Sequence, residues 1–298
     1  MKRINACPAC GADAARSFPA IEAPFIAEWV LERPPARGRF MDCNACGLQF
    51  FDHRFEPHEL QRLYGSYRGE RYTAVRRRHE PWYTERFQRG LNEDDSVVQS
   101  RRARLRELLR PHVDLTSVHR VLDFGGDRGQ FIPPELGRER FVHELSDVEP
   151  VAGVHKLPRV EDLERGGYDL VILSNVLEHA PDPLALLGEV SALVRPGGHL
   201  FVDVPWEHVD TRFYVSAPWM ERWLDALATR AAALRAVDLY STAFRVKLRT
   251  IPPLGFAKLH EHQNVFTAAA LRAALATTPL TLATCRRDTD IVLAIARA

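Results

Sequence analysis

From Val118 onward the sequence alternates short apolar runs with helical intervals, and this alternation constrains the fold more than any other feature. The runs have the length and composition of buried strands, and they cover residues 120–124, 141–145, 168–174, 199–204 and 290–296. Strands that alternate with helices form a parallel sheet with crossover helices. We therefore expect an α/β domain with a Rossmann-like sheet over residues 113–298.

A glycine-rich turn follows the first of these strands. Residues 121–131 read Val-Leu-Asp-Phe-Gly-Gly-Asp-Arg-Gly-Gln-Phe, which predicts a strand, a tight turn after Phe124 and a helix that begins near Arg128. Open α/β sheets bind nucleotide-like ligands at such turns, where glycines let the ligand reach the backbone. A dinucleotide fingerprint is excluded, because Asp127 and Gln130 stand where GxGxxG needs glycines.

Four of the five cysteines form two Cys-x-x-Cys-Gly knuckles, Cys7 with Cys10 and Cys43 with Cys46. Two intervening residues let both thiolates of a knuckle turn onto one ion, and four thiolates close a tetrahedral site with no position left for water. We expect structural Zn²⁺ here, with iron or a redox dithiol as the alternatives. Disulfides are not expected without a secretory signal. Cys285 reads as an ordinary thiol.

The pattern divides the chain into three parts: a zinc ribbon over 1–52, a basic helical linker or cap over 53–112, and the α/β domain over 113–298. Residues 53–110 hold 14 arginines against 9 acids, an excess suited to an anionic partner. The α/β domain contains an insertion at about 205–256 with a predicted helix over 217–237. We expect this insertion to act either as a lid over the site or as a dimerisation element.

Composition restricts the partners only weakly. The chain has 40 basic and 39 acidic side chains, and 36 of the basic ones are arginine, which codon bias explains without nucleic acid. The hydrophobic content of 46% excludes a wholly disordered chain. The apolar runs fall short of the roughly 20 residues of a membrane helix. Because Met1 leads into cysteines and not into an apolar signal region, we expect a cytoplasmic protein without membrane contact.

The glycine turn resembles the first motif of class I S-adenosylmethionine-dependent methyltransferases, a strand followed by Asp-x-Gly-x-Gly-x-Gly, with Asp127 in place of the middle glycine. Residues 168–179, which end in Leu-Glu-His, resemble the fourth-strand motif of that family, and 194–200 resemble the turn before its fifth strand. The resemblance implies that Glu144 holds the cofactor ribose. The acid that holds the adenine amino group in that family is not evident here, and Asp162 is a poor candidate for it. It assigns cofactor binding to Asp123, Phe124, Gly125, Gly126, Arg128, Gly129, Glu144 and Asn175. We expect Asp127 to cap the next helix, with Arg128 as its counter-charge.

A second resemblance concerns residues 259–267, Leu-His-Glu-His-Gln-Asn-Val-Phe-Thr. They do not form a metalloprotease helix, because Asn264 stands where the second ligand histidine belongs. They resemble the His-Glu-His segment of methyltransferases that begin with a zinc-binding domain, a group that includes deoxysugar C-methyltransferases and uses a histidine of this segment as base. The tyrosine-rich stretch 63–72 also resembles that group. The candidate catalytic residues are His179, His262, His260 and Tyr72.

These patterns predict methyl transfer from S-adenosylmethionine to a small molecule such as a sugar nucleotide, a glycan or a natural-product intermediate. The methyl group of a sulfonium is already activated, so the protein has mainly to position the reactants and to supply a base, for which histidine is suited. An RNA-directed methyltransferase and a catalytically silent cofactor-binding partner are the alternatives. The acceptor atom, the histidine that acts as base and the oligomeric state stay open.

Overall fold

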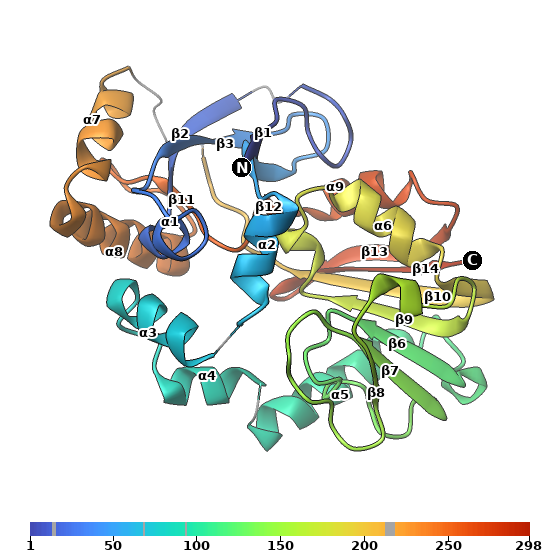
Figure 1. Cartoon of the computed structure of the whole chain (residues 1–298). Helices are drawn as coiled ribbons and strands as arrows, with labels where there is room; N and C mark the ends of the chain where they lie inside the picture. Colours follow the sequence, from blue (N-terminus) through green and yellow to red (C-terminus); the bar gives the residue numbers. More distant parts are fainter. Residues whose placement is uncertain (14–15, 68, 93, 212–217) are drawn as a thin grey trace.

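The centre of the fold is a seven-stranded sheet with the order β13-β14-β10-β9-β6-β7-β8 (Figure 1). The computed structural model describes residues 1–298 apart from 14–15, 68, 93 and 212–217. The strands are β6 (Arg120–Phe124), β7 (Glu139–His143), β8 (His155–Leu157), β9 (Tyr168–Ser174), β10 (Val194–Pro205), β13 (Thr281–Asp288) and β14 (Ile291–Arg297). Strands β8, β7, β6, β9 and β10 are parallel, and β14 is antiparallel to its two neighbours. The strand order reverses between β6 and β9, where such sheets bind their ligands.

The segment after β6 differs from the sequence prediction. Strands β6 and β9 have the predicted bounds, and β7 ends one residue before Glu144. The helix predicted to begin near residue 128 is wrong, because residues 125–138 form only turns and bends. Pro133 and Pro134 cannot donate helical hydrogen bonds. Asp127 takes a left-handed φ of 56°, so it caps no helix.

Helices cover both faces of this sheet (Figure 1). They are α5 (Asp95–Leu109) on one face, and α6 (Pro183–Ser191) with α9 (Ala268–Leu275) on the other. Leu105, Leu108 and Leu109 of α5 form an apolar stripe that packs against the face that carries Leu170. The neighbouring residue Val171 points to the opposite face and packs in the cluster formed with α6 and α9. Both faces are therefore buried, as a parallel sheet requires.

The N-terminal part forms a second sheet, which later residues complete. Its order is β11-β2-β3-β4-β12. The strands are β2 (Arg16–Glu22), β3 (Arg37–Asp42), β4 (Gln49–Phe51), β11 (Ala257–Leu259) and β12 (Asn264–Val265), with β1 (Lys2–Arg3) paired to β5 (His53–Arg54) and α1 (Pro24–Trp29) beside them. The edge strands β11 and β12 flank residues 260–263. The predicted ribbon over 1–52 is thus not self-contained, because its sheet holds the His-Glu-His segment at both ends.

The predicted linker is helical, with α2 (Pro57–Tyr64), α3 (Glu70–His79) and α4 (Glu85–Asn92) before α5. The single helix predicted over 217–237 is wrong, since the structure has α7 (Pro218–Ala228) and α8 (Ala231–Leu248). The chain turns between them because Leu224 and Leu227 of α7 and Leu234 of α8 pack into one buried cluster. The 3-10 helices are η1 (Leu115–Ser117), η2 (Val160–Asp162) and η3 (Leu177–His179). Among the described residues, every helix is too short or too polar to cross a membrane.

Candidate functional site

A cavity of about 910 Å³ lies at the carboxyl ends of β6, β9 and β10. Its walls come from the glycine turn, from η3, from helices α3, α5 and α8, and from residues 260–262. This volume is near the upper end of the range for ligand pockets, so one cavity has room for a cofactor and an acceptor side by side. The insertion predicted as a lid lines this cavity through α8.

The glycine turn folds tightly around the carboxylate of Asp123, which is 3% exposed. A Cβ atom on Gly126 would lie 2.1 Å from the carboxyl carbon of Asp123, and one on Gly125 would lie 2.7 Å from Val176. Glycine is therefore required at both positions. Burial, together with the charges of Asp203 and Glu144, raises the pKa of Asp123 to about 7. A cationic ligand would stabilise its ionised form.

Most of the predicted cofactor residues meet at this cavity. Those that line it are Asp123, Phe124, Gly125, Gly126, Glu144 and Asn175. Arg128 is not among the described lining residues. Its Nε donates to the carbonyl oxygen of Glu149 at 3.0 Å, and its role as counter-charge of Asp127 stays a prediction. Gly129, with a φ of 68°, serves packing, because a Cβ there would lie 2.8 Å from Val154.

The predicted adenine contact is not supported by the geometry. The carboxylate of Asp162 pairs with Arg159 at 2.8 Å, and neither residue is among the described ones that line the cavity. The wall beyond Glu144 continues instead with Ser146. The carboxylate of Glu144 accepts hydrogen bonds from the backbone amides of Asp127 at 3.2 Å and of Ser146 at 2.9 Å, which fixes it at the end of β7.

Two of the predicted histidines meet at the cavity wall. The ring centroids of His179, from η3 after β9, and of His262 are 4.6 Å apart. Nδ1 of His179 lies 3.0 Å from the hydroxyl of Tyr64, and Nδ1 of His262 lies 2.7 Å from the carboxylate of Glu207. Burial lowers the pKa of His179 to about 3. Burial also opposes the charged form of His262, but Glu207 outweighs it and raises the pKa of His262 to about 9.

The third predicted histidine belongs to an ion-pair network beside this pair. Nε2 of His260 lies 2.6 Å from Glu80. Glu261 accepts hydrogen bonds at 2.7 Å from the hydroxyl of Tyr72 and at 2.7 Å from Arg76. Tyr72 is fully buried and is not among the described lining residues, so it acts on the site by holding Glu261. Burial raises the pKa of Tyr72 well above its ordinary value.

Several charged and polar residues of the site were missed in the sequence. Glu178 stands beside His179 in the Leu-Glu-His motif and lines the cavity, with 2% of its surface exposed. Glu207 follows the carboxyl end of β10, and Tyr64 belongs to the tyrosine-rich stretch. The position of Glu207 after a parallel strand was a usable signal. Tyr64 carried no such signal in the sequence, because its contact with His179 joins residues that are 115 positions apart.

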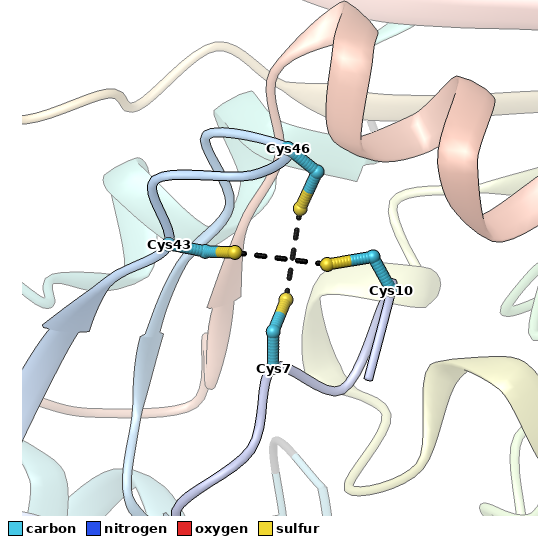
Figure 2. Close-up of side chains that lie close together, drawn as sticks. All are labelled: Cys7, Cys10, Cys43 and Cys46. Atoms are coloured by element: carbon cyan, nitrogen blue, oxygen red, sulfur yellow. Dashed lines mark hydrogen bonds between the residues drawn. The ribbon is translucent and has the colours of Figure 1, made fainter. Parts of the chain in front are cut away.

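The four paired cysteines converge on one point (Figure 2). The Sγ atoms of Cys7 and Cys46, and those of Cys10 and Cys43, are 3.6 Å apart. Tetrahedral ligands at about 2.3 Å from a zinc ion would be about 3.8 Å apart, so the sulfur positions fit such an ion. The glycines after the knuckles, at 11 and 47, take φ values of 74° and 71°, and their amides bond back to the first cysteine of each knuckle. Cys285 is buried elsewhere and bonds to Ala268.

The strand order, the glycine turn at the reversal point and the cavity beside it together define the Rossmann-like fold of class I S-adenosylmethionine-dependent methyltransferases. Residues 91–284 match a family model described as a methyltransferase domain. The chain belongs to this family.

Curated relatives match over short stretches. The ubiquinone biosynthesis O-methyltransferase of Xanthomonas campestris pv. campestris (strain B100) is 36% identical over 75 residues, which are 24% of this chain and 30% of that protein. The Vibrio parahaemolyticus protein of the same name is 53% identical over 36 residues, 12% of this chain and 15% of that protein. The chain thus spans less than a third of the length of these relatives.

Solved structures resemble the chain at low identity. A putative O-methyltransferase from Nostoc punctiforme PCC 73102 has a TM-score of 0.44 and 15% identity, covering 79% of this chain and 63% of that one. An N-methyltransferase from Bradyrhizobium japonicum WM9, in complex with S-adenosyl-L-homocysteine, has a TM-score of 0.37 and 13% identity, covering 70% and 89%.

Proposed function

We propose that the chain transfers a methyl group from S-adenosylmethionine to a small molecule that binds in the same cavity. The observation that carries this proposal is the meeting of two sets of residues in one cavity. The glycine turn with Asp123 and Glu144 forms one part of the wall, and the imidazoles of His179 and His262 form another. Positioning two reactants side by side is the main contribution that a methyltransferase makes.

The residues of the turn fit the cofactor. Gly125 and Gly126 leave the backbone open to a ligand, Asp123 suits a cationic amino group, and Glu144 suits ribose hydroxyls at the end of β7. When bound, the cofactor supplies an electrophilic methyl group on a sulfonium. The buried walls of the cavity exclude water from that group.

The acceptor has to lose a proton as its new bond to the methyl group forms and the bond from sulfur to methyl breaks. His179 and His262 present imidazoles to the cavity, and Glu207 stabilises the protonated form of His262 from 2.7 Å. A positioned base of this kind contributes about 10²- to 10⁴-fold to the rate. We assign the proton to this histidine cluster.

Replacing either of these two histidines with asparagine should lower kcat by about 10²- to 10⁴-fold. The affinity for S-adenosylhomocysteine should stay within about threefold, because the glycine turn is untouched. Methyl transfer from labelled cofactor and calorimetry measure the two effects. His58→Asn is the matched control, since His58 is exposed beside Glu56 and should leave both values unchanged. Full activity in both cluster variants would remove them from the reaction.

The charges around the cavity favour a small acceptor over RNA. Much of the arginine excess in the linker is neutralised inside the molecule by ion pairs, which join Arg62 to Glu32, Arg76 to Glu80, Arg77 to Glu85, Arg78 to Glu28, Arg104 to Asp288 and Arg106 to Glu135. Arg101 and Arg245 line the cavity itself and suit an anionic acceptor such as a nucleotide-linked sugar. Salt-dependent RNA binding would favour the alternative.

Two measurements test the proposed function directly. Calorimetry should show one S-adenosylhomocysteine bound per chain, and a labelled-methyl screen of sugar nucleotides and other small anions should show turnover by the purified protein alone. Absence of cofactor binding would overturn the proposal. Cofactor binding without turnover of any acceptor would favour a catalytically silent partner protein.

The affinity for S-adenosylhomocysteine should fall as the pH is lowered through 7. Burial and the nearby Asp203, Glu144 and Asp127 raise the pKa of Asp123, against the opposing charge of Arg101, to about 7. Because only the carboxylate attracts the amino group of the ligand, binding should weaken about tenfold between pH 8 and pH 6. Calorimetry at both pH values measures this. Asp123→Asn should bind weakly at both, and an equally steep pH dependence in that variant would assign the effect to another group.

A further inference from the structure

The carboxylate of Glu178 is buried in the wall of the cavity without a hydrogen-bond partner. The residue is 2% exposed, and neither of its side-chain oxygens has a partner among the described residues. Nε2 of His179 lies 3.8 Å from one of these oxygens, which is too long for a hydrogen bond. A buried polar group without a partner is rare and costly, so a cation close to this carboxylate would stabilise it.

Two imidazole rings, those of His179 and His262, lie beside this carboxylate. Nδ1 of His179 lies 3.2 Å from the carbonyl oxygen of Glu261, and Nδ1 of His262 lies 2.7 Å from the carboxylate of Glu207. Carbonyl and carboxylate oxygens only accept, so Nδ1 of His262 carries hydrogen, and Nδ1 of His179 carries it in the tautomer that donates to Glu261. In the neutral form of each ring, Nε2 then keeps a lone pair that an ion could use. A histidine that binds a metal has this arrangement, with its second nitrogen bonded to a carboxylate or a backbone carbonyl.

The distances allow one ion to contact all three groups. One ligand atom each from Glu178, His179 and His262 can be chosen so that all lie within 4.8 Å of one another. Two imidazoles and one carboxylate form a common ligand set for Zn²⁺ and other divalent transition metals, with further positions open to substrate. The four-cysteine site offers no such position, since its four thiolates complete a tetrahedron.

We propose that Glu178, His179 and His262 bind a divalent transition-metal ion at the wall of the cavity, as a second metal site distinct from the four cysteines. All three residues line the cavity, so the open positions of the ion face the acceptor. The acceptors that suit such an ion carry two neighbouring oxygen atoms, as in a vicinal diol or a hydroxy-carbonyl group. This inference rests on the proposed methyl transfer for one point only, namely that the acceptor binds in this cavity.

With the ion bound, a different group would accept the proton that the acceptor loses. An imidazole that binds the ion through Nε2 has no lone pair left for a proton. The ion itself then makes a bound hydroxyl more acidic. With the ion bound, His260 would take this proton in place of His179 and His262, because it is the remaining imidazole of the segment that lines the cavity. The oxygen electron pair forms the new bond to the methyl group, and the sulfur keeps the electrons of the bond that breaks.

Equilibrium dialysis of the full chain against Co²⁺, after removal of bound metal, tests the site without any substrate. The wild-type protein should bind two ions per chain. One should show the thiolate charge-transfer absorption of the cysteine site, and the other should show only the weaker bands of nitrogen and oxygen ligands. Glu178→Gln should bind one ion with the thiolate spectrum retained. Glu207→Gln should bind the second ion about 10- to 100-fold more weakly, because Glu207 orients His262.

His58→Ala is the matched control for this experiment. It disrupts the group of Glu56, His58 and Glu59, whose ligand atoms also lie close enough for an ion and of which Glu59 is buried. This variant should still bind two ions. A single ion in the wild-type protein, or a second ion that Glu178→Gln retains and His58→Ala loses, would overturn the proposal. Two bound ions without methyl transfer would overturn the proposed function and support the metal site. Methyl transfer with only one bound ion would overturn the metal site and support the proposed function.

Discussion

Loss of the Zn²⁺ ion that we propose for the four-cysteine site should abolish methyl transfer, although the cysteines are not among the described residues that line the cavity. Cys46→Ser, or removal of the ion by a chelator, leaves thiols that no longer converge on one point. Structural zinc supplies about 10–16 kcal/mol of binding free energy in small domains, and this free energy also supports the fold. We therefore expect β2, β3 and β4 to lose their order, which circular dichroism and zinc content would report together.

The catalytic loss follows from the way in which the His-Glu-His segment is held. Strand β11 pairs with β2 and strand β12 pairs with β4, so residues 260–263 depend on the N-terminal sheet at both ends. The hydroxyl of Thr267 also donates to the carbonyl oxygen of Cys46 at 3.0 Å. When the sheet loosens, His260 and His262 leave the cavity wall, and turnover should fall to background. Binding of S-adenosylhomocysteine should survive in part, because β6 and its turn belong to the other sheet.

Cys285→Ser provides the matched control for the cysteine prediction. Cys285 is buried as well, but it belongs to β13 and donates to the carbonyl oxygen of Ala268 at 3.3 Å, a bond that serine can also make. This variant should keep its zinc and its activity. Undiminished turnover in the metal-free protein would show that the His-Glu-His segment is held without the ion.

The sequence was sufficient for five of the seven strands of the central sheet, because apolar runs mark β6, β7, β9, β10 and β14. The edge strands β8 and β13 are largely exposed and were not predicted. Residues 168–174 form a nearly continuous apolar run, and β9 has these bounds. The helix expected after the glycine turn failed because the left-handed φ of Asp127, followed by Pro133 and Pro134, outweighs the general pattern of a strand, a turn and a helix. Local sequence rules thus predicted the buried strands, but they missed the two edge strands and the connection after β6.

The parts of the site that sequence could not predict depend on contacts between distant residues. Strands β11 and β12 have three and two residues, too few for a periodic pattern, and they form because β2 and β4 offer free edges. The bond between His262 and Glu207 joins residues 55 positions apart. The unpaired state of Glu178 follows from the packing around it and not from its neighbours in sequence. The motifs located the cavity, whereas the folded chain determined the partner of each histidine.

Gly126→Ala should abolish high-affinity binding of S-adenosylhomocysteine while leaving the protein folded. The added Cβ would lie 2.1 Å from the carboxyl carbon of Asp123 and 2.2 Å from one of its oxygens, so the carboxylate or the turn has to move. Overpacking of this kind costs about 1–3 kcal/mol. If the backbone of the turn moves and blocks the ligand, a cost of about 3 kcal/mol corresponds to about a 100-fold loss of affinity.

The response of the turn is predictable because its surroundings are rigid. Asp123 is 3% exposed and lies in β6 between β7 and β9, so its carboxylate has little room to rotate away. The strain therefore falls on residues 125–127, the same backbone that has to approach the ligand. Gly188→Ala is the matched control, because Gly188 lies in α6 with no atom within 4 Å of an added Cβ. It should keep full affinity and raise the free energy of unfolding by about 0.5–1 kcal/mol. Equal affinities in the two variants, measured by calorimetry, would place the cofactor away from the glycine turn.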